Sequence, residues 1–296
     1  MAIRFDNRVA LVTGAGAGLG RAHALALASR GAKVVVNDIG AGAQAVADEI
    51  AAAGGQALAR VASVTDPLAV EAMVADTMQH WGRVDVLVNN AGILRDKSFA
   101  KMSLDDFSLV VNVHLMGAVH CCKSVWDIMR AQNYGRIVMT TSSSGLWGNF
   151  GQSNYGAAKM ALVGLMQTLA LEGEKHNIRV NALAPTAATD MTAGLMPEPD
   201  LALLSTEAVI PALLYLACDD APTRAIVCAG AGSFETAQIA LTQGVHLAAA
   251  SRTAEELAAQ FAAISNRDGS TVPASGAAQT LHELGKAQAV RSLGLD

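Results

Sequence analysis

Tyr155 and Lys159 stand four residues apart in the stretch YGAAK (155–159), a spacing that places both side chains on one face of a helix. A tyrosine phenol has an ordinary pKa of about 10, so it is a poor base at neutral pH. A neighbouring ammonium group stabilises the phenolate and lowers that pKa. The pattern therefore predicts proton transfer, with Tyr155 as general base, or acid in the reverse direction, and Lys159 as its electrostatic activator. A solvated helix face has the same spacing, so other residues must decide between the two.

A glycine-rich loop, VTGAGAGLGRA (12–22), lies between an apolar run and an alanine-rich stretch. Exposed N–H groups and the positive end of a helix dipole attract phosphate at such a junction, and glycines let the backbone approach it. The spacing is T-G-x-x-x-G-x-G rather than G-x-G-x-x-G, and a flexible turn is the alternative interpretation. We expect a dinucleotide to bind here, at Gly14, Gly18, Leu19 and Gly20.

Asp38 ends the next apolar run, eighteen residues after Gly20. An acidic side chain at this place accepts hydrogen bonds from the adenosine ribose of a dinucleotide. The same carboxylate would repel a 2′-phosphate, which favours NAD over NADP as the cofactor. A polar end to a strand is the alternative explanation.

The elements that must position these residues alternate along the chain. Short β-branched runs at 9–12, 33–38, 85–92, 136–142, 178–185 and 225–230 are separated by alanine-rich segments long enough for crossover helices. Continuous apolar runs are typical of strands buried on both faces. The pattern predicts an α/β fold with a doubly wound parallel sheet of the Rossmann type and helices on both faces. We expect a single domain over 1–245 and a C-terminal helical extension over 246–296.

The composition excludes several classes of function. The 296 residues are 52% hydrophobic with a net charge of -5, and no run of Lys or Arg provides a field for nucleic acid or a membrane surface. The longest apolar stretch, 201–217, is interrupted by polar residues and proline. The four cysteines fit neither a metal-ligand spacing nor a secreted disulfide framework, so we expect buried thiols and no metal. These features favour a cytoplasmic protein that acts on small molecules.

Further residues support the catalytic interpretation. Ser142 lies thirteen residues before Tyr155, Asn112 lies in a predicted helix, and NNAG (89–92) ends a predicted strand. Together with the glycine loop, these elements resemble the short-chain dehydrogenase/reductase family from about residue 7 to 245. The resemblance implies that Ser142 holds the substrate oxygen and that Asn112 positions a water that relays protons from Lys159.

The resemblance also implies further cofactor contacts and an assembly state. Asn90, Ala91 and Gly92 would form the floor under the adenosine ribose, and Tyr155 and Lys159 would contact the nicotinamide ribose. Members of the family are homodimers or homotetramers, which we expect here.

Two positions depart from the common family pattern. Ser63 and Val64 stand where many members carry an acidic residue that faces adenine, and Pro185 is followed by TAATD (186–190) instead of glycine. We expect cofactor contacts at Ser63, Val64 and Pro185, while the nicotinamide contacts between 186 and 190 stay open.

The departures and the segments around them are similar to the (3R)-hydroxyacyl-CoA dehydrogenase unit of peroxisomal multifunctional enzymes type 2 and its bacterial relatives. The resemblance implies a 3-hydroxyacyl-CoA substrate, with a hydroxysteroid or another hydrophobic alcohol as the alternative. Apolar residues of the segment 190–215 suit a lipid-like substrate or ordinary core packing: Met191, Leu195, Met196, Leu201, Leu203 and Leu204. Candidates to receive CoA phosphates are Arg95, Lys97 and Lys101.

The chain ends in GLGLD rather than a peroxisomal tripeptide, so a free-standing bacterial-type enzyme is expected. The isolated histidines 114, 246 and 282 are interpreted as packed or surface residues rather than ligands. From another functional class, a nucleotide-binding regulator that kept the fold and lost catalysis is disfavoured, because all four catalytic positions carry competent residues.

Overall fold

The computed structural model describes residues 2–188 and 197–292 of the chain. It divides into two compact units, Met1–Ala237 and Gln238–Asp296. The first unit ends eight residues before the boundary expected from the sequence, because the last strand of the sheet ends at Ala237.

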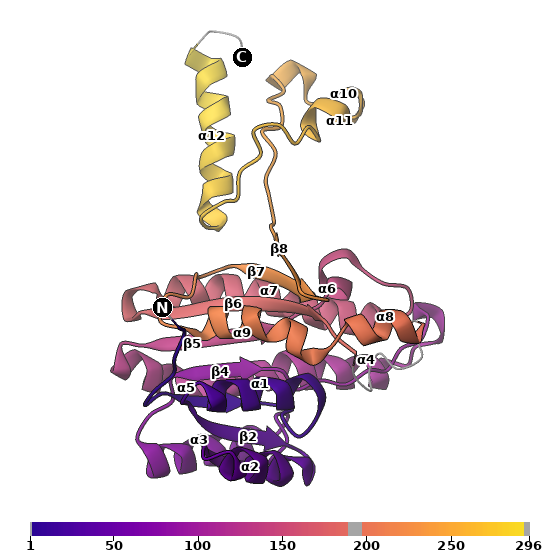
Figure 1. Ribbon diagram of the computed structural model, residues 1–296. Helices are drawn as coiled ribbons and strands as arrows, with labels where there is room; N and C mark the ends of the chain where they lie inside the picture. The colour runs from indigo at the N-terminus through magenta and orange to yellow at the C-terminus, as the bar shows by residue number, and fades with distance from the viewer. Residues whose placement is uncertain (1, 189–196, 293–296) are drawn as a thin grey trace. The chain divides into compact units, whose positions relative to one another are not determined.

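A single eight-stranded sheet forms the centre of the first unit, in the order β3-β2-β1-β4-β5-β6-β7-β8 (Figure 1). The strands are β1 (Val9–Val12), β2 (Lys33–Asp38), β3 (Gln56–Val61), β4 (Val86–Asn89), β5 (Gly135–Thr140), β6 (Ile178–Thr186), β7 (Ile226–Gly230) and β8 (Ser233–Ala237). All neighbouring pairs are parallel except β7 and β8, which pair antiparallel. The order reverses between β1 and β4, which confirms the doubly wound Rossmann-type sheet.

Two strands, β3 and β8, were not expected from the sequence. They are the edge strands of the sheet, and both carry polar residues among the apolar ones, as in QALARV and SFETA. An edge strand is half solvated, so it lacks the continuous apolar run that marks a central strand.

Helices cover both faces of the sheet. The core on one face contains side chains from α1 (Gly18–Ser29), α2 (Gly42–Ala52) and α9 (Ile210–Ala217). The core on the other face contains side chains from α3 (Pro67–Trp81), α5 (Gly117–Gln132) and α7 (Ser153–Gly173). Residues of one strand alternate between the faces: in β1, Ala10 and Val12 join the first core, and Leu11 joins the second.

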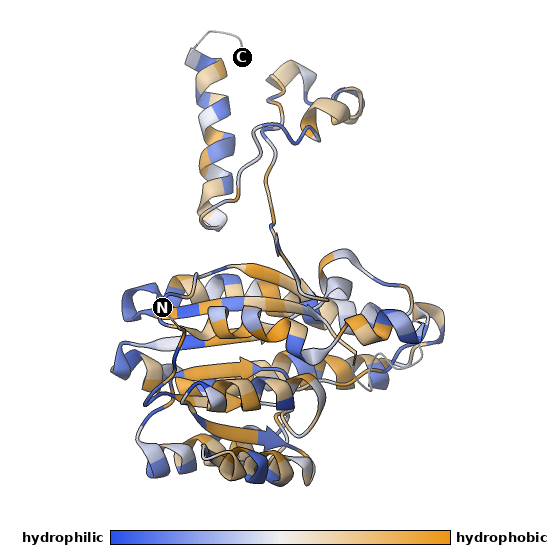
Figure 2. Ribbon diagram, in the orientation of Figure 1, coloured by the Kyte–Doolittle hydropathy of each residue, from blue (hydrophilic) through white to orange (hydrophobic). Residues whose placement is uncertain are grey.

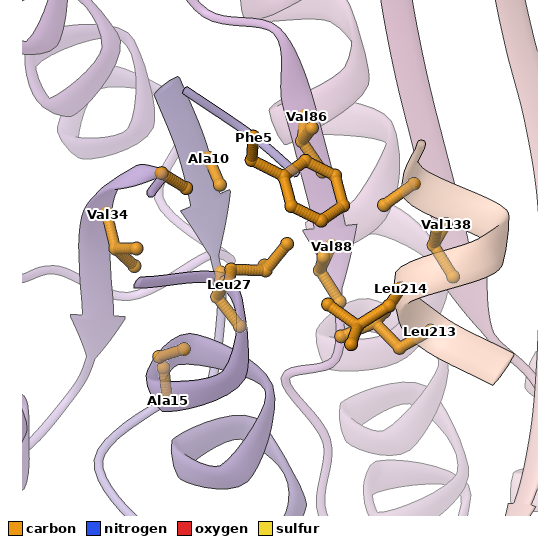
Figure 3. Close-up of a cluster of buried hydrophobic side chains, with 14 of the residues drawn as sticks. Phe5, Ala10, Ala15, Leu27, Val34, Val86, Val88, Val138, Leu213 and Leu214 are labelled. Atoms are coloured by element: carbon orange, nitrogen blue, oxygen red, sulfur yellow. The ribbon is translucent and has the colours of Figure 1, made fainter. Parts of the chain in front are cut away.

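Apolar burial accounts for the rigidity of this scaffold. Figure 2 shows hydrophobic residues along the strands, and Figure 3 shows Val86, Val88 and Val138 facing Phe5, Leu27 and Leu213. Each fully buried Val, Leu or Phe contributes roughly 1.5–3 kcal/mol relative to exposure. The sheet therefore fixes the positions at which its strands end.

Side chains cap the N-termini of several helices. The side chain of Asp66 accepts hydrogen bonds from the N–H groups of Leu68 and Ala69 at the start of α3, before Pro67. Ser103 caps α4 (Leu104–Val111) in the same way. Each cap contributes about 1 kcal/mol by satisfying N–H groups that the helix leaves unpaired.

A π-helical turn, Asn112–Met116, joins α4 to α5. Its hydrogen bond runs from the N–H of Gly117 to the carbonyl of Asn112, one residue longer than in an α-helix. Such a turn changes which side chains face the protein interior, and these turns occur frequently at functional sites. Two further short helices, α6 (Ser143–Trp147) and α8 (Glu198–Leu203), follow β5 and β6.

The second unit consists of short helices, and none of its described residues, 238–292, is buried. The helices are α10 (Ala254–Ala259), α11 (Phe261–Ile264) and α12 (Gly276–Ser292). Leu241 and Thr271 form an antiparallel bridge, and the side chains of His282 and Lys286 both bond to the carbonyl of Gln243.

Candidate active site

The carboxyl ends of the parallel strands place most of the predicted site residues at one edge of the sheet. The glycine loop follows β1, Asp38 ends β2, Asn90 follows β4 and Ser142 follows β5. Ligands of open α/β sheets bind at this edge, where the strand order reverses.

Thr13 and Asn90 hold the glycine loop against the end of β4. The Thr13 hydroxyl accepts hydrogen bonds from the N–H groups of Asn90 and Ala91, at 3.0 and 3.1 Å. The Asn90 amide donates to the carbonyls of Thr13 and Gly14, both at 3.0 Å. Asn90 therefore stabilises the glycine loop through hydrogen bonds to its main chain, a role that the sequence did not predict.

At two positions of the loop, Gly14 and Gly20, the backbone conformation or the lack of space disfavours any residue with a Cβ atom. Gly14 has φ +60, and a Cβ on Gly20 would collide with the Gly14 carbonyl oxygen and the Asn90 amide. No side chain caps the first turn of α1, which begins at Gly18 after the N-cap Ala17. An uncapped helix N-terminus behind a close-packed glycine turn fits a phosphate group. Leu19 packs against the apolar core below the loop.

Asp38 also fixes the loop. One carboxylate oxygen accepts the N–H of Gly16 at 2.9 Å, and the other accepts the N–H groups of Ile39 and Gly40 at 2.7 and 3.2 Å. The side chain is partly exposed, so a carboxylate that organises this loop also remains accessible to a ligand.

The other expected cofactor positions lie around the same edge with different local roles. The Ser63 hydroxyl is 2.8 Å from that of Thr65, and Val64 is 6% exposed. Val64 packs so closely that a Cβ on Gly117 would collide with its side chain. Pro185 lies in β6, beside Ala229 of β7.

The three central catalytic candidates come together at the start of α7. Ser142 caps α6 by accepting the N–H of Ser144, and its hydroxyl acts on Tyr155 in the direction that lowers the pKa of the phenol. The Lys159 ammonium nitrogen is 5.4 Å from the centre of the Tyr155 ring and donates to the carbonyl of Thr140 at 2.6 Å. The structure thus places one hydroxyl, one phenol and one amine in a single cluster, in which Ser142 and Lys159 are buried and Tyr155 is partly buried.

The pKa of Tyr155 departs from the expectation drawn from the sequence. Burial raises the pKa of the phenol, the Ser142 hydrogen bond opposes that effect, and the carboxylate of Asp96 adds to it. Burial also lowers the pKa of Lys159 to about 7. The chain's own residues therefore do not produce an acidic phenol, because both groups are buried away from water and each resists its charged form.

Asn112 does not join the cluster. Its side chain is exposed at the first residue of the π-helical turn, whereas His114, two residues later, is 3% exposed. The rings of His114 and Tyr155 meet edge to face, with centroids 5.2 Å apart. The signal was present in the sequence: Val110, His114, Ala118 and Cys121 follow the helical period of buried residues, and Asn112 does not.

The segment Ile93–Lys97, here called the strap, follows Gly92 in the chain and is hydrogen-bonded to residues at the start of α7. The Gln152 amide donates to Asp96 at 2.7 Å, and the Asn154 amide donates to the carbonyl of Arg95 at 3.1 Å. The N–H of Lys97 donates to the carbonyl of Gly151 at 2.9 Å. These three bonds hold the first turn of the helix that carries Tyr155, and sequence reasoning missed them because the partners lie more than fifty residues apart.

The candidates for substrate contacts are only partly described. Of the apolar residues expected to contact a lipid chain, Met191, Leu195 and Met196 lie outside the described residues, while Leu203 is 67% exposed at the end of α8. Arg95 and Lys97 are exposed and lie 3.9 and 3.8 Å from the carboxylate of Asp106.

Neither a metal site nor a membrane span is evident in the described parts of the chain. Residues 2–188 and 197–292 contain no cluster of three His, Cys, Asp or Glu side chains suited to a metal ion. None of the helices in the same ranges combines the length and apolar character needed to cross a bilayer. Cys121, Cys122, Cys218 and Cys228 are free thiols, and Cys228 is only partly buried.

Comparison with known proteins places this geometry in a family. Peroxisomal multifunctional enzyme A of Dictyostelium discoideum is 43% identical over 93% of the chain, which spans 64% of that protein. The solved full-length peroxisomal multifunctional enzyme type 2 of Drosophila melanogaster superposes with a TM-score of 0.85 at 36% identity, covering 97% of this chain and 51% of that one. A 7α-hydroxysteroid dehydrogenase solved with NADH and 7-oxo glycochenodeoxycholic acid has a TM-score of 0.73 at 31% identity, covering 78% of this chain and 95% of that one. Residues 8–200 match the short chain dehydrogenase model, and the chain belongs to that family of oxidoreductases.

Proposed function

We propose that the protein is an NAD-dependent dehydrogenase that interconverts a secondary alcohol and a ketone, with a 3-hydroxyacyl-CoA as its substrate. The observation that carries the proposal is the cluster of Ser142, Tyr155 and the buried Lys159, beside strand ends that also hold a glycine loop. A regulator without catalysis would have no need for a buried amine whose pKa lies near neutrality.

The choice of NAD is supported by the glycine loop and Asp38. The uncapped N-terminus of α1 and the turn at Gly14 fit a pyrophosphate, and the carboxylate of Asp38 fits a ribose with two free hydroxyls. The same carboxylate disfavours the extra phosphate of NADP. When bound, the nicotinamide ring would supply the acceptor for the two electrons of the alcohol carbon.

The residues of the cluster have separate roles in the proposed reaction. The Ser142 hydroxyl donates to the substrate oxygen and holds it beside the phenol. Tyr155 removes the hydroxyl proton in oxidation and returns it in reduction. Lys159, held by the Thr140 carbonyl, lowers the energy of the phenolate when it is protonated. Because burial alone raises the pKa of Tyr155, the remaining stabilisation of the phenolate must accompany cofactor binding.

The acyl-CoA proposal rests on similarity and on exposed apolar side chains near the cluster. Relatives that cover most of this chain are named multifunctional or hydratase-dehydrogenase enzymes. Trp147 and Phe150, which lie between Ser142 and Tyr155 in the chain, are 68% and 91% exposed. Side chains of this kind suit an acyl chain, and the exposed Arg95, Lys97 and Lys101 suit the phosphates of CoA.

A hydroxysteroid is the second candidate substrate. It is favoured by the structural similarity to a 7α-hydroxysteroid dehydrogenase whose solved complex contains a bile-acid ketone. A steroid would use the same exposed apolar side chains but would make no use of the basic residues.

The test is a substrate screen that follows NADH formation with (3R)-hydroxyacyl-CoAs, hydroxysteroids and aliphatic secondary alcohols. We expect the highest kcat/KM with the CoA thioesters. The same acids without CoA should react with a kcat/KM lower by about a hundredfold or more, because remote binding energy is lost. Equal rates with and without CoA would favour the steroid or simple-alcohol alternative. No NADH formation with any class would refute dehydrogenase activity on these substrates.

We also propose a homodimer or homotetramer in the cytoplasm. The four free thiols support a reducing compartment, and the family resemblance supports the oligomer. Light scattering coupled to size-exclusion chromatography should give two or four times the mass of one chain.

A further inference from the structure

A buried histidine beside the phenol has no part in the mechanism described so far. His114 lies in the π-helical turn, on the side that faces the protein interior, and is 3% exposed. Its ring and that of Tyr155 meet edge to face, with 5.2 Å between centroids and 89° between the planes. The imidazole is therefore the wall against which the phenol ring packs.

The main chain holds this imidazole in place. Its Nε2 atom lies 3.0 Å from the N–H nitrogen and 2.8 Å from the carbonyl oxygen of Ile93, the first residue of the strap. Gly92 makes room for the ring, because a Cβ at that position would collide with the imidazole. Gly92 is therefore needed to leave space for the His114 ring as well as at the expected cofactor site. The strap is hydrogen-bonded at one end to His114 and at the other to residues at the start of α7.

The surroundings keep the imidazole neutral. Burial, followed by the nearby charge of Lys159, lowers the pKa of His114 to about 3. Its Nδ1 atom has no hydrogen-bond partner among the described residues. A leucine or phenylalanine would fill the same space without leaving a polar atom unpaired, so the imidazole is explained by the hydrogen bond of its Nε2 atom to the Ile93 main chain and not by packing alone.

We propose that His114 is a positioning residue for Tyr155: anchored to the Ile93 main chain, its ring packs against the phenol ring, fixes it in place and excludes water from that side. The proposal rests on the role of Tyr155 in proton transfer proposed above. The charged groups near the phenol are Lys159 on its own helix and Asp96 on the strap, and both remain when His114 is replaced.

The decisive variant is His114→Asn, which keeps a polar side chain for the Ile93 main chain but removes the ring that packs against Tyr155. We expect kcat to fall about tenfold or more, because a catalytic group misplaced by a fraction of an ångström loses much of its rate, while KM for NAD stays within about twofold. Water admitted to the phenol should lower the Tyr155 pKa, so the acidic limb of the kcat profile should move to lower pH.

A second variant separates the ring from the hydrogen bond. His114→Phe keeps an aromatic ring against Tyr155 and loses the hydrogen bond to the Ile93 main chain, so its kcat should exceed that of His114→Asn. His80→Asn, which makes the same change on the exposed end of α3, serves as the matched control and should behave as wild type. Melting temperatures and NAD binding of all variants show whether each is folded.

Ultraviolet difference titration gives a measurement that does not depend on turnover. The chain has only three tyrosines, so subtracting the titration of Tyr155→Phe isolates the ionisation of Tyr155. We expect a lower pKa in His114→Asn than in the wild type. The proposal would be overturned if a folded His114→Asn variant kept both the acidic limb of its kcat profile and the pKa of Tyr155 unchanged. It would also be overturned if kcat for His114→Phe were no higher than for His114→Asn. Failure of the wild type in the substrate screen would count against the proposed function and leaves the titration as an independent test of His114.

Discussion

The two halves of the candidate site are built in different ways. In the cofactor half, the glycine loop is held by hydrogen bonds between main-chain groups and the side chains of Thr13, Asn90 and Asp38. In the proton-transfer half, the partly buried Tyr155 lies next to the buried side chains of Lys159 and His114, and all three have shifted pKa values. The first half depends on backbone shape and the second on electrostatics, so substitutions in the two should change different measured quantities.

The largest effect should come from Tyr155→Phe, which removes only the phenol oxygen from the proton-transfer half. We expect kcat to fall by about a hundredfold to ten-thousandfold, the usual contribution of a general base. The dissociation constant of NAD, measured by calorimetry, should stay within about threefold. Substantial remaining turnover would remove Tyr155 from the role of base and end the distinction between the halves.

Gly20→Ala should produce the opposite result in the cofactor half. The added methyl group collides with the Gly14 carbonyl and the Asn90 amide, so the loop must move. Strain of this kind should weaken NAD binding by about ten- to hundredfold. The measurement is NAD affinity, with Gly164→Ala on α7, where a Cβ meets nothing within 4 Å, as the control. Normal affinity in Gly20→Ala would mean that the dinucleotide does not depend on this turn.

Asp38→Ala should change selectivity more than rate. Loss of the three main-chain bonds disturbs the loop for either cofactor, so the ratio of kcat/KM for NADP to that for NAD isolates the carboxylate. We expect this ratio to rise about tenfold, the worth of a charged hydrogen bond together with relief of repulsion. A constant ratio would contradict the ribose assignment.

Asp96→Asn should shift the pH dependence with little effect on maximal rate. The Asp96 carboxylate raises the pKa of Tyr155, so removing its charge lowers that pKa and makes the base form available at lower pH. We expect the acidic limb of kcat to move down by about half a pH unit. Asn can still accept the hydrogen bond from Gln152, which keeps the strap in place. A limb that stays in place or moves to higher pH would show that Asp96 does not act on the phenol.

The smallest effect is expected for Asn112→Ala, whose side chain the structure leaves in solvent. Its kcat should exceed that of His114→Asn by about tenfold, since only the latter changes a group that contacts Tyr155. If the two variants lose equal activity, the exposed asparagine belongs to the proton-transfer half after all.

The sequence predicts the parallel sheet and the glycine loop well, because both depend on local patterns. The apolar runs of the central strands and the T-G-x-x-x-G-x-G spacing can be recognised within a few residues of chain. The caps of α3, α4 and α10 also depend on local patterns, because the side chains of Asp66, Ser103 and Thr253 accept N–H groups only two or three residues further along the chain.

The electrostatics of the site could not be predicted in the same way. The raised pKa of Tyr155 depends on how deeply the phenol is buried, and the strap depends on partners such as Asp96 and Gln152, 56 residues apart. His114 was interpreted as an ordinary packed histidine because nothing in the sequence announces a π-helical turn. Its helical spacing from other buried residues was the one available signal, and it separates His114 from Asn112.

The lack of any fully buried residue among those described from 238 to 292 has a consequence for how the chain unfolds. A segment without a buried core has little apolar driving force of its own, so we expect its helices to open at low free energy and its amide protons to exchange quickly. Proteases should cut there first, and the sheet up to Ala237 should persist as a resistant fragment.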